Sequence, residues 1–229
     1  MSRQILIIFL LLSSIACSVD KIDLQNQFGV EYYPLQTGNY RIYDVDQTIY
    51  ELGMPSPANF QLKETVVDSF VNQGGGYTYT LHREIWDEIQ ETWNLTDSWS
   101  ARLSDTEAVL AEGNTHYLKL AFPLSPNKTW DGNAYNTMDE EIYEADSIDL
   151  VFTVAEQDIQ NTVTIVQSNN LDKIVETDYR IEKYAPGIGL IYKEITNLEY
   201  CTSNDSCLGQ QIIESGLIYK QSIIAFGNE

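Results

Sequence analysis

The fold class of this chain is decided by the stretch Tyr77-Thr78-Tyr79-Thr80-Leu81-His82-Arg83-Glu84-Ile85. Its residues alternate, with Tyr, Tyr, Leu, Arg and Ile on one face and Thr, Thr, His and Glu on the other. A period of two is typical of a β-strand that packs one face against a core. The β-branched run 62–71 and the turn signal Gly74-Gly75-Gly76 come just before it, so the whole segment predicts a β-hairpin.

The same reading extends outward along the chain. Turn signals recur about every ten residues, which predicts an all-β fold, an antiparallel barrel or sandwich, with a lipocalin-like barrel favoured. Met54-Pro55-Ser56-Pro57 is expected to be a loop, and any helix would be short, at 87–92 or 139–144. The other expected strands are 40–45, 99–103, 108–111, 116–122, 148–154, 162–167, 177–184, 190–200 and 211–226, the last broken at Ser215-Gly216.

The first sixteen residues have the composition of a secretory signal peptide. Arg3 supplies a positive charge, residues 5–12 are apolar, and small residues follow. The apolar run is too short for a comfortable membrane span. Ser14-Ile15-Ala16-Cys17 resembles the lipobox of bacterial lipoproteins, which implies cleavage before Cys17 and acylation of that cysteine. We therefore expect a signal peptide over 1–16, a tether over 17–30 and a single β-rich domain over 31–229.

The residue after the cysteine bears on the destination of the protein. In proteobacterial lipoproteins an Asp at this position retains the protein at the inner membrane. Ser18 stands here instead. By that analogy the sequence predicts a cell-envelope protein, anchored in the outer membrane through its acyl chains.

The charge of the chain limits its partners. It has 13 basic and 34 acidic residues, a net charge of −21. Nucleic acid is excluded as a partner, because phosphate binding needs clustered Lys and Arg. Anionic lipid headgroups would also repel the chain, so acyl chains have to hold it at a membrane. Disorder is excluded as well, since 15 Tyr, 7 Phe and 4 Trp supply the apolar surface that disordered chains lack.

Two of the three cysteines lie close together near the C-terminus. Cys201 and Cys207 flank Thr-Ser-Asn-Asp-Ser, in which Asn204-Asp205 is a turn signal. An exported protein reaches an oxidising compartment, so a disulfide is expected. A metal site is the rival interpretation, but no His or second Cys pair lies nearby.

A family resemblance covers most of the mature chain. Residues 33–43 (YPLQTGNYRIY), Phe122-Pro123-Leu124 with Thr129-Trp130, and residues 184–192 (YAPGIGLIY) resemble patterns in uncharacterised envelope lipoproteins of Bacteroidota. The resemblance implies a β-rich, envelope-anchored domain. It carries no catalytic residue over to this chain, because that group has no assigned chemistry.

Catalytic and metal signatures are weak. His82 and His116 stand apart in separate strand candidates, and the chain has no Gly-x-Ser-x-Gly elbow and no phosphate-binding loop. Asp131, Asn133 and Asp139 offer oxygen ligands for calcium, but the spacing departs from the EF-hand template. A solvated acidic loop is the favoured interpretation, and we expect no metal, no other cofactor and no catalytic residue.

Three tryptophans gather in one stretch and are the best candidates for ligand contact. Trp86, Trp93 and Trp99 lie near Asn94 and Asp97. Exposed, they would stack on a glycan or a small apolar ligand, whereas buried, they would fill the core. We expect a non-catalytic binding or structural module whose partner is such a ligand or another envelope protein. The alternative is a carboxylate-dependent glycan-active hydrolase, with two carboxyl groups about 5–10 Å apart in a cleft.

Overall fold

The protein is described by a computed structural model that covers residues 29–172 and 174–229. The predicted signal peptide, the predicted lipidation site Cys17 and the predicted tether up to residue 28 lie outside the described residues. Gly29, with φ at +79°, precedes a short 3₁₀ turn, η1 (Val30–Tyr32). Tyr32 Oη donates to the Asn161 carbonyl at 2.8 Å, so the structured chain is fastened to the sheet from its first described residues.

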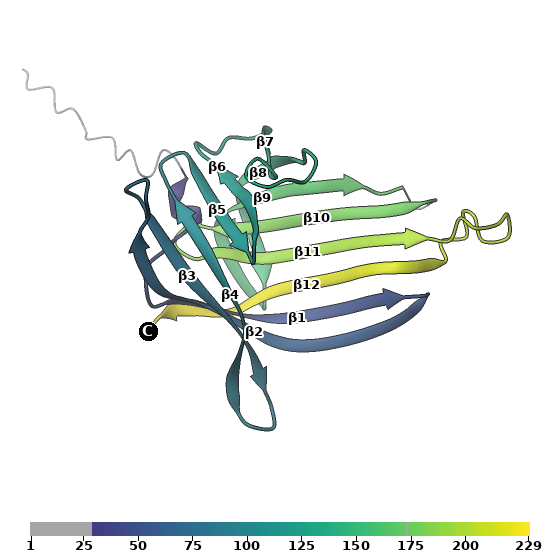
Figure 1. The fold of residues 1–229 in the computed structure, drawn as a ribbon, viewed down its shortest axis with the longest axis horizontal. Coiled ribbons are helices and arrows are strands. Elements are labelled where there is room, and N and C mark those ends of the chain that lie inside the picture. The colour runs from purple at the N-terminus through teal and green to yellow at the C-terminus, as the bar shows by residue number, and fades with distance from the viewer. Residues whose placement is uncertain (1–28, 173) are drawn as a thin grey trace, which may run out of the picture.

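Twelve β-strands make up the rest of the ordered secondary structure in the described ranges (Figure 1). They are β1 (Asn39–Glu51), β2 (Met54–Val71), β3 (Tyr77–Asp87), β4 (Thr92–Leu103), β5 (Glu107–Glu112), β6 (Thr115–Ala121), β7 (Lys128–Asp131), β8 (Ile142–Val154), β9 (Gln157–Asn170), β10 (Glu176–Ala185), β11 (Gly189–Tyr200) and β12 (Ile213–Asn228).

All twelve strands belong to one antiparallel sheet. Their order is β6-β5-β4-β3-β2-β1-β12-β11-β10-β9-β8-β7. Every strand therefore pairs with its neighbour in sequence, except at two places. The first strand pairs with the last, from Asn39 opposite Asn228 to Tyr50 opposite Gly216, and the sheet edges fall at β6 and β7. Figure 1 shows β3 to β6 running at a steep angle to β10, β11 and β12, as strands do around a barrel wall.

The two sheet edges meet at one point. The Leu118 amide on β6 donates to the Gly132 carbonyl just after β7 at 2.9 Å, and Trp130 Nε1 donates to the Leu118 carbonyl at 3.0 Å. The sheet is thus a nearly closed barrel. The prediction of an all-β antiparallel barrel is confirmed, with twelve strands in place of the eight of a lipocalin.

Two apolar clusters stabilise the barrel. The larger contains Val66, Leu81, Leu120, Ile165 and Tyr184, which come from both halves of the sheet. The other contains Tyr43, Leu62, Ile191 and Ile223, with Phe152 packed against it. Burial of such side chains contributes about 1.5–3 kcal/mol each.

The expected loop at Met54-Pro55-Ser56-Pro57 is instead the beginning of β2, and the prediction was wrong there. This part of β2 pairs with β1 alone, because the pairing of β2 with β3 begins only at Leu62. Proline removes a backbone donor and is therefore tolerated on a strand with one free edge. Pro55 and Pro57 lie on such an edge.

The expected short helices are absent from the described residues. Residues 88–91 form the turn between β3 and β4, and Asp87 Oδ1 at the end of β3 accepts hydrogen bonds from the amides of Ile89 and Gln90. Residues 139–141 form a loop that leads into β8. No helix within 29–172 and 174–229 is long and apolar enough to cross a membrane.

The expected break of the last strand at Ser215-Gly216 is also wrong, since β12 runs through it. Gly216 has φ at +134°, and a Cβ built on it would lie 2.2 Å from the carbonyl oxygen of Asn197 on β11. A glycine within a strand often marks such a close backbone approach. The residue marks a tight strand contact, and no strand ends there.

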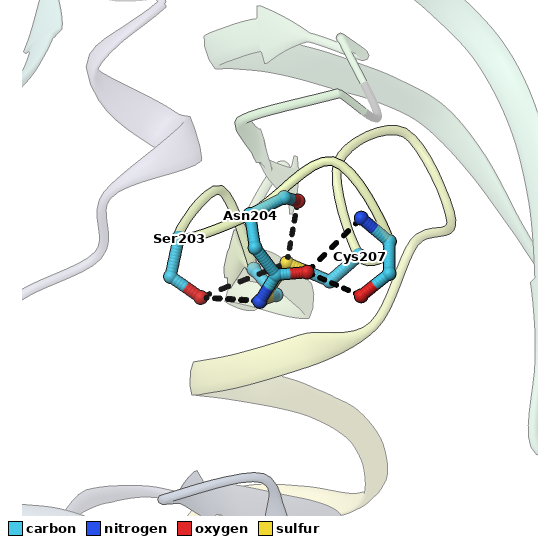
Figure 2. The surroundings of a disulfide bond; sticks show 5 residues. Ser203, Asn204 and Cys207 are labelled. Carbon is cyan, nitrogen blue, oxygen red and sulfur yellow. Dashed lines mark hydrogen bonds between the residues drawn. A yellow bond between two sulfur atoms is a disulfide. The ribbon is translucent and has the colours of Figure 1, made fainter.

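Cys201 and Cys207 form a disulfide, with their Cα atoms 5.6 Å apart. The enclosed loop is a hydrogen-bonded turn around Asn204 (Figure 2). The Asn204 carbonyl accepts from the Cys207 amide at 3.1 Å, and Asn204 Oδ1 accepts from the Ser206 amide at 3.0 Å. The turn signal at Asn204-Asp205 therefore had a structural basis.

The double substitution Cys201→Ser with Cys207→Ser is expected to lower the free energy of unfolding by about 1–3 kcal/mol, because a short loop constrains the unfolded chain only modestly. Urea denaturation of oxidised wild type and of the variant measures the difference. Alkylation of exported protein without reductant, followed by intact-mass measurement, should find neither thiol modified. Two alkylated thiols would contradict the assignment.

Candidate functional site

A cavity of about 240 Å³ lies on the concave side of the sheet. Its lining residues come from β1 to β6 and from β10 to β12, together with Tyr33 from the segment after η1. The lining strands follow one another without a break from β6 at one edge of the sheet, through β1 and β12, to β10, so they surround the cavity and it lies inside the barrel. Its apolar wall consists of Leu81, Trp99, Leu110, Leu190, Ile195 and Leu217.

The first charged group in this wall is a carboxylate between two guanidinium groups. Arg41, Glu64 and Arg83 are direct cross-strand partners on β1, β2 and β3. Arg83 Nε donates to Glu64 Oε1 at 3.0 Å, and Arg41 Nη2 lies 3.8 Å from Glu64 Oε2. Arg41 and Glu64 are both buried. One carboxylate therefore balances only one of two buried or half-buried cations.

The second charged group repeats this arrangement with lysines. Lys119 Nζ donates to Glu182 Oε1 at 2.6 Å, and Lys193 Nζ lies 3.5 Å from the same oxygen. Tyr184 Oη donates to Glu182 Oε2 at 2.5 Å. Glu182 is only 1% exposed. Such burial is tolerated because both carboxylate oxygens have donors.

The protonation states of this second group follow from its contacts. Burial raises the pKa of Glu182. The charges of Lys119 and Lys193 and the hydrogen bonds from Lys119 and Tyr184 lower it by more, so that the pKa is about 2. Burial lowers the pKa of Lys119, yet the attraction of Glu182 and Glu112 outweighs it and holds that pKa above its ordinary value. Lys119 and Glu182 are therefore both ionised at neutral pH.

Three tyrosine hydroxyls at the wall are uncharged. Burial raises the pKa of Tyr33 and of Tyr184, and burial together with Glu64 raises that of Tyr219 to about 12 against the opposing charge of Arg83. All three phenols stay protonated at neutral pH. Tyr219 Oη donates to Gln221 Oε1 at 2.7 Å, and this bond orients the Gln221 amide. The amide nitrogen of Gln221 has no hydrogen-bond partner.

The wall as a whole is cationic in an acidic protein. Four cations line the cavity, Arg41, Arg83, Lys119 and Lys193, against the three carboxylates Glu64, Glu112 and Glu182. The excess is one positive charge, whereas the whole chain carries −21. The barrel interior and the chain as a whole therefore have opposite signs of charge.

The three candidate tryptophans do not gather at one place. Trp99 pairs with Leu81 and lines the cavity, with its ring 3.8 Å from the Arg83 guanidinium carbon. Trp86 and Trp93 pair with each other on the opposite face, with ring centroids 5.2 Å apart. Trp86 there borders an outer groove. All three side chains are half-buried, so each contributes to packing, and only Trp99 reaches the central cavity.

The two faces give the tryptophans different expected effects on stability. Trp86→Ala with Trp93→Ala should lower the free energy of unfolding by about 1–2 kcal/mol, because half-buried outer rings lose little more than their pair contact. Trp99→Ala alone should cost about 3 kcal/mol, because it opens the interior wall and removes the ring that packs on the Arg83 guanidinium. Urea denaturation measures both. A double variant less stable than Trp99→Ala would contradict the assignment of faces.

The acidic loop after β7 is organised by its own hydrogen bonds. Asp131 Oδ1 accepts from the amides of Asn133 and Glu141 at 2.9 and 3.0 Å, and Asn133 Nδ2 donates to the Asp139 carbonyl at 2.7 Å. Within residues 29–172 and 174–229 no group of His, Cys, Asp and Glu has the arrangement of a metal site. The side chains of Asp131 and Asn133, two of the three residues considered as calcium ligands, thus hold the loop together.

Sequence motifs did not predict the charged residues of the cavity, although the sequence carries a signal for two of them. Arg83 stands on the otherwise apolar face of the stretch that decides the fold, and Arg41 lies on the same face of β1 as Tyr43 and Val45. A charge on the core-facing side of a strand is unusual unless it is paired. His82 and His116, by contrast, are not among the residues that line the cavity.

Two solved structures are similar to this chain at low sequence identity. No protein-family model and no curated protein matches the chain. Among solved structures, a Bacteroides fragilis protein described as exported, with a YmcC-like fold, is similar at 14% identity and a TM-score of 0.49. A Parabacteroides distasonis protein described as a lipoprotein is similar at 10% identity and a TM-score of 0.42. Each likeness covers 86% of this chain and 98% of the other.

Proposed function

We propose that this protein is an outer-membrane lipoprotein of a bacterial envelope whose barrel binds a small ligand without catalysing a reaction. The observation that carries the binding role is the interior cavity, which combines an apolar wall with fixed charged groups. Binding sites for small molecules have this composition, with a few placed polar groups on an apolar lining. The envelope anchor rests on the lipobox-like segment ending at Cys17.

The size of the cavity limits the ligand. About 240 Å³ is below the usual range of about 300–1,000 Å³ for drug-sized ligands. The ligand is therefore a compact molecule or the short apolar part of a larger one. The strand network around the cavity supports a pre-formed site, since nine hydrogen-bonded strands hold its walls.

The charges of the cavity argue against the hydrolase alternative. A glycan hydrolase needs one carboxyl group that stays protonated near neutral pH to act as general acid. Glu182 has the opposite property, since neighbouring lysines lower its pKa to about 2. Glu64 is held between two guanidinium groups. Glu182 is therefore not suited to donate a proton to a leaving group.

The binding role is tested on protein purified from membranes. Denaturing extraction and mass spectrometry should find a small molecule in wild type that is lost from Leu110→Trp, in which a larger side chain fills the cavity. Leu95→Trp, at an exposed position, is the control for the added ring. Identical extracts from wild type and Leu110→Trp would defeat the proposal, as would turnover on a glycan panel that Glu182→Gln abolishes without unfolding the barrel.

The anchor gives a separate prediction. Cys17→Ala should remove the acyl chains and move the protein from the membrane to the soluble fraction, because anionic lipid repels a chain with a net charge of −21. Labelling with a fatty-acid probe, followed by fractionation, measures both effects. Ser18→Ala is the matched control and should keep the label. Equal labelling of Cys17→Ala would refute lipidation at this cysteine.

A further inference from the structure

We infer that the cavity takes the ionised acidic group of an organic anion, with the apolar part of that ligand against Leu81, Leu110 and Trp99. This inference rests on the proposed binding function and adds the chemical class of the ligand. Three features of the described residues support it: the charge balance of the wall, two unused donors and the apolar lining.

The charge balance leaves room for one more negative group. Glu64 faces Arg41 and Arg83, and Glu182 faces Lys119 and Lys193, so each carboxylate leaves one cation uncompensated. Glu112 offsets one of the two. A buried charge is costly unless it is paired. A ligand with one negative charge would neutralise the wall.

Unused hydrogen-bond donors lie in the same wall. Among the described residues, the buried side-chain nitrogens with no hydrogen-bond partner are Arg41 Nε, Gln221 Nε2 and Gln167 Nε2. The first two belong to residues that line the cavity. Gln221 is 1% exposed, and its oxygen is already occupied by Tyr219. Buried donors without acceptors are rare, and an anionic oxygen is the strongest acceptor for them.

The apolar lining selects against a small inorganic anion. A hydrated ion would make no apolar contact with the side chains that line the cavity, which are Leu81, Leu110, Leu190, Ile195 and Leu217. An acyl or similar chain buries them and gains about 25 cal/mol per Å² of apolar surface removed from water. The ligand class is therefore a carboxylate, sulfonate or phosphate ester with a short apolar body.

The experiment compares three probes that share one tail. Octanoate, octanol and octylamine are titrated into the wild-type protein and followed by calorimetry. Octanoate is expected to bind at least about tenfold more tightly than octanol, the effect of one charge-assisted hydrogen bond. Octylamine should bind most weakly. Octanol or octylamine binding as tightly as octanoate would overturn the inference while leaving a binding role intact.

Variants locate the anion at the predicted donors. Gln221→Glu keeps the shape and the acceptor for Tyr219 but replaces the free donor by a charge, so octanoate affinity should fall at least about tenfold. Gln167→Glu is the matched control, because it makes the same change at a buried glutamine outside the cavity, and it should leave octanoate affinity unchanged. An unaltered affinity in Gln221→Glu would refute the site.

The three probes are compared on the wild-type protein, so that result does not depend on whether a variant folds. The molecule extracted from native protein gives a second readout. An extract whose cavity-dependent component has no ionised acidic group would overturn the anion inference but not the binding role. The proposed function itself would be refuted if wild type and Leu110→Trp gave the same extract and none of the three probes bound.

Discussion

Glu182→Ala is expected to lower the free energy of unfolding by about 3–5 kcal/mol, the cost of leaving a buried charge without its partner. Lys119 is 5% exposed and has Glu182 as its ion-pair partner. Removing the carboxylate also strands Lys193 and takes away the acceptor of the Tyr184 hydroxyl. Urea denaturation of the variant beside wild type measures the loss.

A paired replacement separates charge from packing. In the double variant Lys119→Met with Glu182→Leu, apolar side chains of similar volume fill the site, and part of the lost stability should return because no buried Lys119 charge is left without a partner. A single variant as stable as wild type would contradict the assignment. So would a double variant less stable than Glu182→Ala, since the loss would then arise from shape and not from the unpaired charge.

The same carboxylate predicts how stability depends on pH. Its pKa is about 2 in the folded protein against 4.5 ordinarily, so folding favours the ionised form. The contribution of Glu182 is therefore complete above about pH 4.5 and disappears as the pH falls toward 2. The stability difference between wild type and Glu182→Gln should shrink over that window and stay constant above it.

Gly216→Ala is the second substitution with a large expected effect, about 3–5 kcal/mol. Its φ of +134° is strained for any residue with a Cβ, and that atom would lie 2.2 Å from the Asn197 carbonyl oxygen and 2.8 Å from Leu198 Cα. Both neighbours are backbone atoms of β11, so relief requires β11 and β12 to separate. Thermal unfolding followed by circular dichroism measures the effect.

Gly113→Ala is the matched control for Gly216→Ala. Gly113 also has a positive φ, +60°, but a Cβ there would meet nothing within 4 Å. Its cost is the backbone strain alone, about 1 kcal/mol. Equal losses in the two variants would show that φ, and not the contact with β11, sets the cost at Gly216.

The strand pattern was predictable because alternation is a local property. Residues 77–85 alternate in sequence and lie within β3. The sides of β4 were not predictable, since Arg83 pairs with Asp97 but Glu84 pairs with Leu95, and the extra residue reverses the faces beyond it. This bulge explains why Trp93 and Trp99 point to opposite sides although six residues separate them.

The candidate site required pairing register, which alternation does not supply. Arg41, Glu64 and Arg83 become neighbours only because three strands align at those residues, and Glu182 meets Lys193 in the same way. β1, β2 and β3 each contribute one charged residue to the first group, and alternation within a strand does not show which charges will face each other. A shift of one residue in the strand pairing would turn these charges toward solvent. The sequence therefore identifies the charged residues but not which of them become neighbours.

The seam between β1 and β12 dictates the order in which the molecule assembles. It joins Asn39 to Asn228, residues 189 positions apart, whereas the other strand pairs join neighbours in the chain. Local hairpins close quickly, and long-range closure is slow because loop entropy has to be overcome first. On the proposed export route, the half-meanders β1 to β6 and β7 to β12 can therefore form early. The interior takes shape only after the C-terminal strand has arrived, because Leu217, Tyr219 and Gln221 of β12 line the cavity. A chain that stalls before β12 therefore has no complete interior wall.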